Sequence, residues 1–398
     1  MKYFILLCDG MADYKLESLG NRTPMEAAVK PCMDELASKS FCGLVSNVPE
    51  GMVPESDTAN LAVMSYDPAV YSKGRSPLEA VSMGLNMDSD QTAFRCNVVT
   101  ISDSASLEDS IMLDHSADEI TTDEADKIIK TIDEDLGTEK LEFHTGISYR
   151  HCLLWRDAPD FKDFVRPHDI LGQRIGEHLP PEPFLSLIRQ SREILDNHPI
   201  NVARIARGLK PANCIWLWSP GKKPTLPSFE EKWGLKASVI SAVDLIKGIG
   251  LCAGMESIDV EGATGNVNTN YSGKADAAID AFKRGRDFVY VHVEAPDECG
   301  HRAETENKVK AIELIDSKIL APVYEYLRET GDDYRIMVLP DHPTPIAKRT
   351  HTMDPVPFFI YNPEESAKGV DKFTEDSCSG TGLYIPHGYN LLDKVIVR

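Results

Sequence analysis

Short apolar runs that alternate with helical patterns are the feature of this 398-residue sequence that most restricts its fold. Several runs are nearly continuous and β-branched, as in parallel strands that are buried on both faces. Helical patterns separate them, which predicts βαβ units and a doubly wound, mostly parallel α/β sheet with helices on both faces. The expected strands are residues 3–8, 215–218, 237–240, 288–293 and 334–339, and the expected helices are 31–38, 184–197, 242–249, 274–283 and 308–330.

The middle of the chain has a different pattern of short strands around one helix. We expect strands at 93–101, 111–113, 141–143 and 149–155, with a helix at 122–132. This pattern favours a small inserted α+β domain over residues 91–180, between two parts of a core domain at 1–90 and 181–398. Paired prolines in "LPPEP" (179–183) mark the expected return to the core.

Composition and charge exclude several classes of protein. The net charge of −21 disfavours nucleic acid or an anionic membrane as a partner, because each would repel the chain. The nine cysteines form no CxxC pair, which suits a reduced, cytoplasmic protein. No stretch approaches the roughly 18 apolar residues of a membrane span, and "YFILLC" is too short for a signal peptide. We therefore expect a soluble, cytoplasmic protein.

Three of the predicted strands lead into an aspartate, namely Asp9, Asp297 and Asp341. In open α/β sheets, ligands bind beyond the carboxyl ends of the strands. Three carboxylates gathered there would repel one another unless cations neutralised them. The sequence therefore predicts a metal site built from distant parts of the chain.

Histidines lie close to these aspartates in the sequence. His301 follows Asp297 by one helical turn, so both side chains could reach one ion. His342 adjoins Asp341, and His351 follows in the same segment. Mixed carboxylate and imidazole ligands suit Zn²⁺ or Mn²⁺ better than Ca²⁺, and Mg²⁺ also fits. Two such ions would form a clamp suited to displacement at phosphorus.

The stretch "VPESDTANLAV" (53–63) places Ser56 before an apolar helical pattern. Taken alone, it predicts a serine that caps the helix. Beside metal ions, the hydroxyl of Ser56 would lose its proton more easily and could act as a nucleophile. The N–H groups of the helix would then face the phosphoryl oxygens. The two roles are compatible.

Segments along almost the whole chain occur in the order typical of one enzyme family. They include "CDGMAD", "SDTANLAVMSYDP", "AFRCN", "GISYRH", "PHDI", "ANCIWLW", "GATGNVNTNY", "VHVEAPDECGH" and "HTMDPVPFFIY". On these segments the chain resembles the archaeal-type cofactor-independent (2,3-bisphosphoglycerate-independent) phosphoglycerate mutases of the alkaline phosphatase superfamily. The resemblance implies an alkaline-phosphatase-like fold and a two-metal phosphotransferase. Such an enzyme interconverts 3-phosphoglycerate and 2-phosphoglycerate through a phosphoserine, without 2,3-bisphosphoglycerate.

The same resemblance implies roles for particular residues, with Ser56 as the phosphorylated nucleophile. One implied metal has four ligands and the other has three: Asp9, Ser56, Asp341 and His342, and then Asp297, His301 and His351. Arg150 and His151 of "SYRH" would clamp the anionic end of a small phosphorylated metabolite, and Lys247 would contribute to the same task. Whether the chain forms a homo-oligomer stays open.

Departures from the mutase pattern keep other functions open. Glu55 and Asn60 stand where the mutases tend to have glycine and histidine. The segment "LDHSADEI" (113–120) supplies His115 and acidic residues where the mutases carry arginine. Those acidic residues could suit a substrate with an ammonium group, as in a homoserine kinase-like enzyme that uses ATP. A solvated loop before a helix also explains them, because acidic residues are favoured at the N-terminus of a helix. A metal-dependent phosphatase and a catalytically inactive binding protein are further alternatives.

Overall fold

The computed structural model describes residues 1–365 and 367–396, and the chain forms two compact units. Unit 1 comprises Met1–Ser72 and Thr225–Arg398, and unit 2 comprises Lys73–Pro224. Unit 2 is longer at both ends than the predicted insertion. None of the described helices is long and apolar enough to cross a membrane.

The prediction that the run at 215–218 belongs to the core sheet is wrong. This run lies in β7 (Cys214–Lys222), which pairs with β3 (Gln91–Ile101) of unit 2. A continuous apolar run indicates that a strand is buried on both faces, but it does not indicate which sheet contains the strand. The return to the core therefore comes after β7 and not at the prolines.

Unit 1 is built on an eight-stranded sheet in which the described pairings are parallel, except that β12 is antiparallel to β2 and β11. This arrangement confirms the predicted α/β class. Residues of β1 are almost all buried, because helices cover both of its faces. In spatial order the strands are β13 (Tyr384–Ile385), β2 (Phe41–Val45), β12 (Val356–Tyr361), β11 (Tyr334–Leu339), β1 (Lys2–Cys8), β10 (Phe288–Val293), β8 (Ala237–Ile240) and β9 (Glu256–Ile258).

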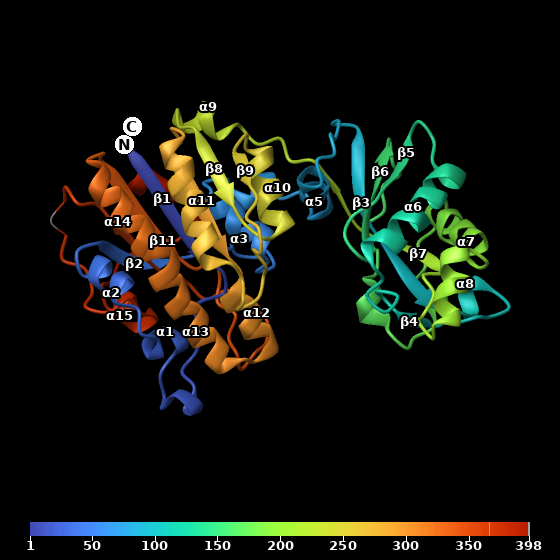
Figure 1. The fold of residues 1–398 in the computed structure, drawn as a ribbon, viewed down its shortest axis with the longest axis horizontal. Helices are drawn as coiled ribbons and strands as arrows, with labels where there is room; N and C mark the ends of the chain where they lie inside the picture. Colours follow the sequence, from blue (N-terminus) through green and yellow to red (C-terminus); the bar gives the residue numbers. More distant parts are fainter. Residues whose placement is uncertain (366, 397–398) are drawn as a thin grey trace. The chain divides into compact units, whose positions relative to one another are not determined.

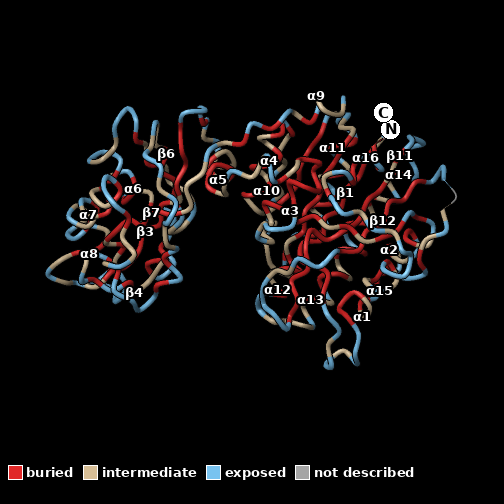
Figure 2. The backbone as a smooth tube through the Cα atoms, turned by 180° about the vertical axis from the view of Figure 1, so that it is seen from behind, coloured by how far each residue is buried: buried red, intermediate tan, exposed pale blue. Residues whose placement is uncertain are grey.

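Helices lie on both faces of this sheet (Figures 1 and 2). On one face, Phe4 of β1 packs in a core with apolar residues of α11, α13 and α14. On the other face, α3 contacts Tyr290 of β10, and Gly250 of α10 approaches Val239 of β8. The helices of unit 1 are α1 (Pro24–Ala27), α2 (Pro31–Ser38), α3 (Ser56–Val63), α4 (Pro68–Tyr71), α9 (Phe229–Trp233), α10 (Asp244–Cys252), α11 (Tyr271–Lys283), α12 (Ala295–Arg302), α13 (Thr305–Ile315), α14 (Ala321–Thr330), α15 (Glu375–Ser379) and α16 (Leu392–Val395).

A π-helical turn, Asp316–Leu320, interrupts the predicted helix at 308–330 between α13 and α14. Pro322, near the start of α14, has no backbone N–H to continue the α-helical ladder. Asp316 in this turn accepts hydrogen bonds from the backbone N–H groups of Cys32 and Met33, at 3.2 and 2.6 Å. Its carboxylate therefore caps the N-terminus of α2.

Unit 2 is an antiparallel five-stranded sheet with helices packed on both faces. Residues alternate along β3, so Phe94 and Val98 pack against α6 and α7, while Arg95 and Asn97 belong to the opposite face. The strands are β3, β4 (Met112–Asp114), β5 (Leu141–His144), β6 (Arg150–Arg156) and β7, and the helices are α5 (Ser76–Ser82), α6 (Thr122–Leu136), α7 (Phe184–Leu195) and α8 (Pro199–Ala206).

Candidate metal centre

Three adjacent parallel strands bring the predicted aspartates to one edge of the unit 1 sheet. Strand β1 pairs with β10 on one side and β11 on the other, so the carboxyl ends of all three strands meet. Asp9 follows β1, Asp297 lies in α12 after β10, and Asp341 follows β11. All three are buried. The structure thus places the three aspartates at the same end of neighbouring strands.

Gly10 allows these segments to approach one another. Its φ is +61°, a conformation that side chains disfavour. A Cβ atom at this position would lie 2.7 Å from the Cα of Asp297 and 2.5 Å from the Oγ1 of Thr344. Any larger residue would therefore push the Asp9 segment away from α12.

Oxygen atoms of two distant residues, Ser56 and Asp9, and of the adjacent Asp341 converge on His342. Its Nε2 lies 3.4 Å from Ser56 Oγ, 3.5 Å from Asp341 Oδ2 and 3.7 Å from Asp9 Oδ1. Ligand atoms of Asp9, Asp297 and His342 also lie within 4.8 Å of one another. The four residues that were expected around one metal are thus brought together.

Asp297, His301 and His351 form a second group whose ligand atoms lie within 4.8 Å of one another. The two carboxylate oxygens of Asp297 each lie 3.3 Å from the Nε2 of one histidine. The Nδ1 atoms face backbone carbonyls, His301 that of Arg349 at 3.0 Å and His351 that of Pro54 at 2.6 Å. Hydrogen bonds of this kind orient a metal-binding imidazole.

The surroundings of Asp9 fit a bound cation. Its Oδ1 is buried and has no hydrogen-bond partner among the described residues. Burial, followed by the charges of Asp341 and Asp297, raises the pKa of Asp9 well above its ordinary value. A divalent ion would satisfy the orphaned oxygen and reduce the repulsion. Carboxylate and imidazole donors in this number match Zn²⁺ or Mn²⁺.

Ser56 is the first residue of α3, and Glu55 occupies the N-cap position. The interpretation of Ser56 as a helix cap is therefore wrong, since its hydroxyl faces His342. The first turn of a helix carries partial positive charge from its free N–H groups. This charge favours an anion beside the Ser56 hydroxyl.

Asn60 links the nucleophile to the acidic cluster. Its Nδ2 donates to Asp341 Oδ2 and to the backbone carbonyl of Ser56, both at 2.9 Å. The hydroxyl of Tyr290 donates to Asn60 Oδ1 at 2.6 Å. Asn60 is fully buried, so these contacts orient Asp341 and the start of α3. An amide supplies both the donor and the acceptor that this position needs.

His292 orients Asp9, and the sequence analysis missed it. It lies in β10 with no exposed surface, and its Nε2 is 2.8 Å from Asp9 Oδ2. Its Nδ1 is 3.1 Å from Ser241 Oγ, which accepts from the N–H of Val243. An ionised Asp9 can only accept, so Nε2–H of His292 donates to it, and the neutral ring then accepts at Nδ1 from the Ser241 hydroxyl. The one available signal was a histidine inside an otherwise apolar strand.

The replacement His292→Leu is expected to weaken Mn²⁺ binding by about 10- to 100-fold, the range typical of lost outer-shell contacts. Asp9 would lose the donor that fixes its Oδ2. Calorimetric titration of the full chain with Mn²⁺ measures the change, with His178→Leu in unit 2 as the control and thermal unfolding as the check on folding. Unchanged Mn²⁺ affinity in a folded variant would show that Asp9 is oriented without His292.

A buried ion pair supports the loops that carry the centre. Lys308 Nζ lies 2.7 Å from Asp13 Oδ2, and both side chains have no exposed surface. Lys308 also donates to the carbonyl of Thr344 at 2.8 Å, and the Thr344 hydroxyl donates to Asp297. The pair therefore ties the segment after β1 to the segment after β11.

The replacement Lys308→Met is expected to lower the free energy of unfolding by about 3–5 kcal/mol, because it leaves the buried charge of Asp13 uncompensated. Urea unfolding measures the loss. Lys310→Met, on the exposed side of the same helix, is the matched control and is expected to change stability by less than about 0.5 kcal/mol. Equal stability of the two variants would contradict the supporting role.

The residues predicted to bind substrate belong to both units, Arg150 and His151 to β6 of unit 2 and Lys247 to α10 of unit 1. Arg150 and His151 are neighbours in β6 and therefore point to opposite faces of its sheet. Arg150 is exposed, whereas His151 is buried and accepts from the N–H of Gly146 at 3.1 Å. Lys247 pairs with Asp259 at 2.7 Å. Of the predicted pair, Arg150 is the residue whose side chain can meet a ligand from solvent.

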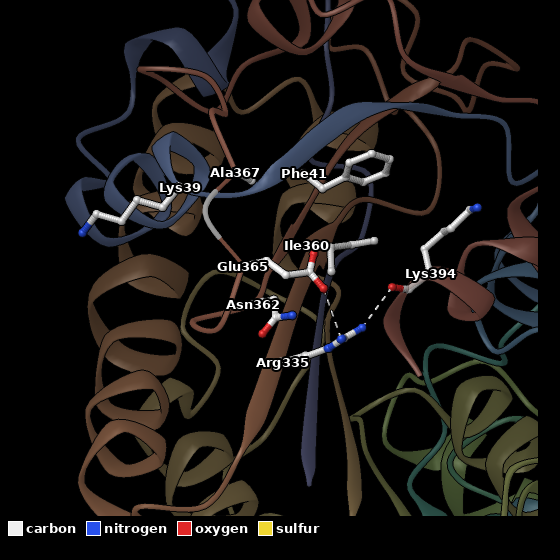
Figure 3. Close-up of a pocket in the computed structure, with 8 residues that line it drawn as sticks. All are labelled: Lys39, Phe41, Arg335, Ile360, Asn362, Glu365, Ala367 and Lys394. Atoms are coloured by element: carbon white, nitrogen blue, oxygen red, sulfur yellow. Dashed lines mark hydrogen bonds and ion pairs between the residues drawn. The ribbon is translucent and has the colours of Figure 1, made fainter. Parts of the chain in front are cut away.

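A hollow at the other end of β11 lies apart from the metal centre (Figure 3). Arg335, near the start of β11, pairs with Glu365 at 3.5 Å and donates to the carbonyl of Lys394 at 3.4 Å. The ammonium groups of Lys39 and Lys394 point away from Arg335. The cations do not converge, and we assign this hollow no role.

Comparison with known proteins identifies the family. A family model described as 2,3-bisphosphoglycerate-independent phosphoglycerate mutase matches residues 37–201. Two curated proteins with that name, from Methanosarcina acetivorans and Methanosarcina mazei, are each 46% identical to this chain over 402 residues, with all of both chains covered. The chain belongs to this family.

Solved structures agree with membership of the mutase family. The cofactor-independent phosphoglycerate mutase from Thermoplasma acidophilum superposes with a TM-score of 0.66 at 27% identity, covering 99% of each chain. The PH0037 protein from Pyrococcus horikoshii superposes with a TM-score of 0.80 at 27% identity, covering 99% of this chain and 96% of the other. The similarity therefore spans both units.

Proposed function

We propose that this chain interconverts 3-phosphoglycerate and 2-phosphoglycerate through a phosphoserine at Ser56, without 2,3-bisphosphoglycerate. The observation that carries the proposal is the position of the Ser56 hydroxyl. It stands at the N-terminus of α3, 3.4 Å from His342 and beside the buried acidic cluster. Full-length relatives named as phosphoglycerate mutases support the choice of substrate.

The proposal includes two divalent metal ions, Mn²⁺ or Zn²⁺, with Mg²⁺ as the third candidate. Seven side chains would hold them: Asp9, Ser56, Asp341 and His342 for one ion, and Asp297, His301 and His351 for the other. When bound, such ions supply positive charge that lowers the pKa of a serine hydroxyl and offsets the charge of a phosphoryl group. The orphaned oxygen of Asp9 and the converging imidazoles support this assignment.

Ser56 performs the first transfer by attacking the phosphorus of 3-phosphoglycerate. A bond forms between Ser56 Oγ and phosphorus, the bond from phosphorus to O3 of glycerate breaks, and O3 gains the proton that the serine loses. The positive first turn of α3 stabilises the charge on the phosphoryl oxygens. Asn60 and His292 meanwhile keep the carboxylates of Asp341 and Asp9 in place.

The second transfer returns the phosphoryl group to the bound glycerate. Its 2-hydroxyl attacks the phosphorus of phosphoserine, and the bond from phosphorus to Ser56 Oγ breaks. The proton of the 2-hydroxyl passes to the serine, so the enzyme is regenerated. Ser56 is partly buried, which limits competition by water.

Phosphorus NMR of the metal-loaded protein tests the proposal. With 3-phosphoglycerate alone, we expect 2-phosphoglycerate to form to equilibrium without added 2,3-bisphosphoglycerate. A parallel sample contains homoserine and ATP. Phosphohomoserine with ADP in that sample would replace the mutase proposal by a kinase, and release of inorganic phosphate alone would replace it by a phosphatase.

A further inference from the structure

Thr344 lies between the two groups of potential metal ligands and has no exposed surface. Its hydroxyl donates to Oδ1 of Asp297, and its Oγ1 lies 3.3 Å from Nδ1 of His342. His342 is among the ligands proposed for one ion, and Asp297 is among those proposed for the other. One hydroxyl therefore contacts a ligand of each ion.

The hydroxyl of Thr344 determines which nitrogen of His342 carries a proton. A hydroxyl has one proton to donate and a carboxylate can only accept, so this proton lies in the hydrogen bond to Asp297. The contact between Oγ1 and the imidazole then requires Nδ1–H of His342 to donate. A neutral ring that is protonated at Nδ1 has its lone pair at Nε2, the nitrogen that faces Ser56 and Asp341. The contact thus leaves that nitrogen free to bind an ion.

The two groups of ligands are also connected through Asp297 and the histidine rings. The oxygen of Asp297 that accepts from Thr344 lies 3.3 Å from Nε2 of His351. The rings of His351 and His342 stack with their centroids 3.9 Å apart. A closed circuit of contacts therefore joins His342, Thr344, Asp297 and His351, and a change at the hydroxyl reaches both groups.

The position of Thr344 is fixed by its backbone and by two glycines. Its N–H donates to the carbonyl of Ala12 at 3.3 Å, and its carbonyl accepts from Lys308 Nζ at 2.8 Å. A Cβ atom at Gly300 would lie 2.8 Å from Cγ2 of Thr344, and one at Gly10 would lie 2.5 Å from its Oγ1. These segments leave the side chain little room to turn, so packing holds the hydroxyl in place before an ion binds.

We propose that Thr344 is a positioning residue that serves both ion sites at once. It accepts from Nδ1 of His342, which presents Nε2 to one ion, and it donates to Oδ1 of Asp297, which orients that carboxylate toward the other. Hydrogen-bond partners of this kind fix the tautomer and the direction of a metal-binding side chain. The presence of the ions rests on the proposed function, whereas the chain of hydrogen bonds rests on these contacts. Loss of the hydroxyl is therefore expected to weaken both sites.

Calorimetric titration of the metal-free full chain with Mn²⁺ tests the role of the hydroxyl. Thr344→Val leaves Nδ1–H of His342 without an acceptor and is expected to weaken the binding of both ions by about 10- to 100-fold. Thr344→Ser retains the hydroxyl and is expected to restore the affinity for both. Thr100→Val is the matched control, because Thr100 is also buried and its hydroxyl donates to the carbonyl of Pro211 in unit 2. It should bind Mn²⁺ as wild type does.

Proton and nitrogen-15 NMR of the Zn²⁺-loaded chain gives a readout that a purely structural threonine would not change. In wild type, the Nδ1 proton of His342 is expected at the low-field position of a hydrogen-bonded N–H, and His342→Gln assigns the signal by its loss. The signal should stay there in Thr344→Ser and move to higher field in Thr344→Val. Thermal unfolding of Thr344→Val, expected to match that of Thr100→Val, checks folding, and the wild-type signal tests the contact without any variant at Thr344.

Three results would overturn the role of Thr344. The first is an Nδ1 proton of His342 at the field of an unbonded N–H in wild type. The second is equal Mn²⁺ affinity of Thr344→Val and Thr100→Val at either ion site. The third is a loss of affinity in Thr344→Val that Thr344→Ser shares in full, since the hydroxyl would then not be the group that matters.

An assay of phosphoglycerate interconversion distinguishes this inference from the proposed function. If wild type interconverts the phosphoglycerates while Thr344→Val binds both ions as Thr100→Val does, the role of Thr344 is wrong and the mutase function stands. If both affinities depend on the hydroxyl but wild type forms no 2-phosphoglycerate, the function is wrong and the role of Thr344 stands. The expected result is interconversion by both proteins, with Thr344→Val needing about 10- to 100-fold more Mn²⁺ for half-maximal activity.

Discussion

Replacement of Ser56 by alanine is expected to lower kcat for phosphoglycerate interconversion by about 10⁴-fold or more, because it removes the atom that forms the bond to phosphorus. Alanine is a strong helix former, so α3 should still begin at this position. The metal centre keeps its imidazoles and carboxylates, and substrate binding should change far less than kcat. A coupled assay for 2-phosphoglycerate measures the loss.

Ser46→Ala is the matched control for the nucleophile. Within the described part of the chain, the Ser46 hydroxyl contacts the hydroxyl of Tyr384 at 2.8 Å and no residue of the metal centre. Mass spectrometry of wild type quenched during turnover should locate phosphate on the peptide that contains Ser56. Phosphate on a different residue, or turnover by Ser56→Ala within about tenfold of wild type, would exclude the phosphoserine mechanism.

The strand-end part of the site could be predicted because one physical rule governs it. Continuous apolar runs indicated parallel strands, and parallel strands present their carboxyl ends at the same edge. Asp9, Asp297 and Asp341 therefore had to be neighbours if their strands were. His301 followed from helical spacing, since it lies one turn beyond Asp297. These four positions needed no knowledge of the rest of the fold.

The supporting contacts could not be predicted, because each depends on how distant segments pack. Asn60 meets Asp341 only when α3 is placed across the end of the sheet. His292 meets Asp9 through the register between β1 and β10. Lys308 gives the same helical pattern whether it is exposed or buried against Asp13. Burial of a polar side chain is a property of the tertiary structure.

The start of α3 and the sheet that contains β7 show a second limit. A shift of one residue at the start of α3 decides whether the Ser56 hydroxyl caps the helix or faces His342. Sequence signals locate the end of a helix only to within one or two residues. The apolar run of β7 is compatible with either sheet. In both cases the helix or strand was predicted correctly. The contact of the Ser56 hydroxyl and the sheet that contains β7 were not.

Asp297→Asn is expected to remove a ligand of the site that includes His301 and His351, to weaken the neighbouring site as well, and to lower kcat by about 10³-fold or more. Among the described residues, Asp297 is the one carboxylate common to the two groups of potential ligands. Although burial alone would raise it, hydrogen bonds from His301 and His351 hold the pKa of Asp297 well below its ordinary value. The side chain is therefore an anion where the two imidazoles meet it, and a neutral amide of the same size removes that charge.

A graded comparison separates loss of charge at Asp297 from general damage to the centre. His301→Ala belongs to one group of ligands and should reduce metal content by one ion per chain at most, whereas Asp297→Asn should reduce the binding of both. Glu298→Gln, the next residue along α12, pairs with Arg302 and serves as the control. Elemental analysis after dialysis against Mn²⁺ measures metal content, and calorimetry measures affinity. Wild-type affinity for both ions in Asp297→Asn would show that neither ion needs this carboxylate. The ligands would then be Asp9 and Asp341 for one ion and the two histidines, His301 and His351, for the other.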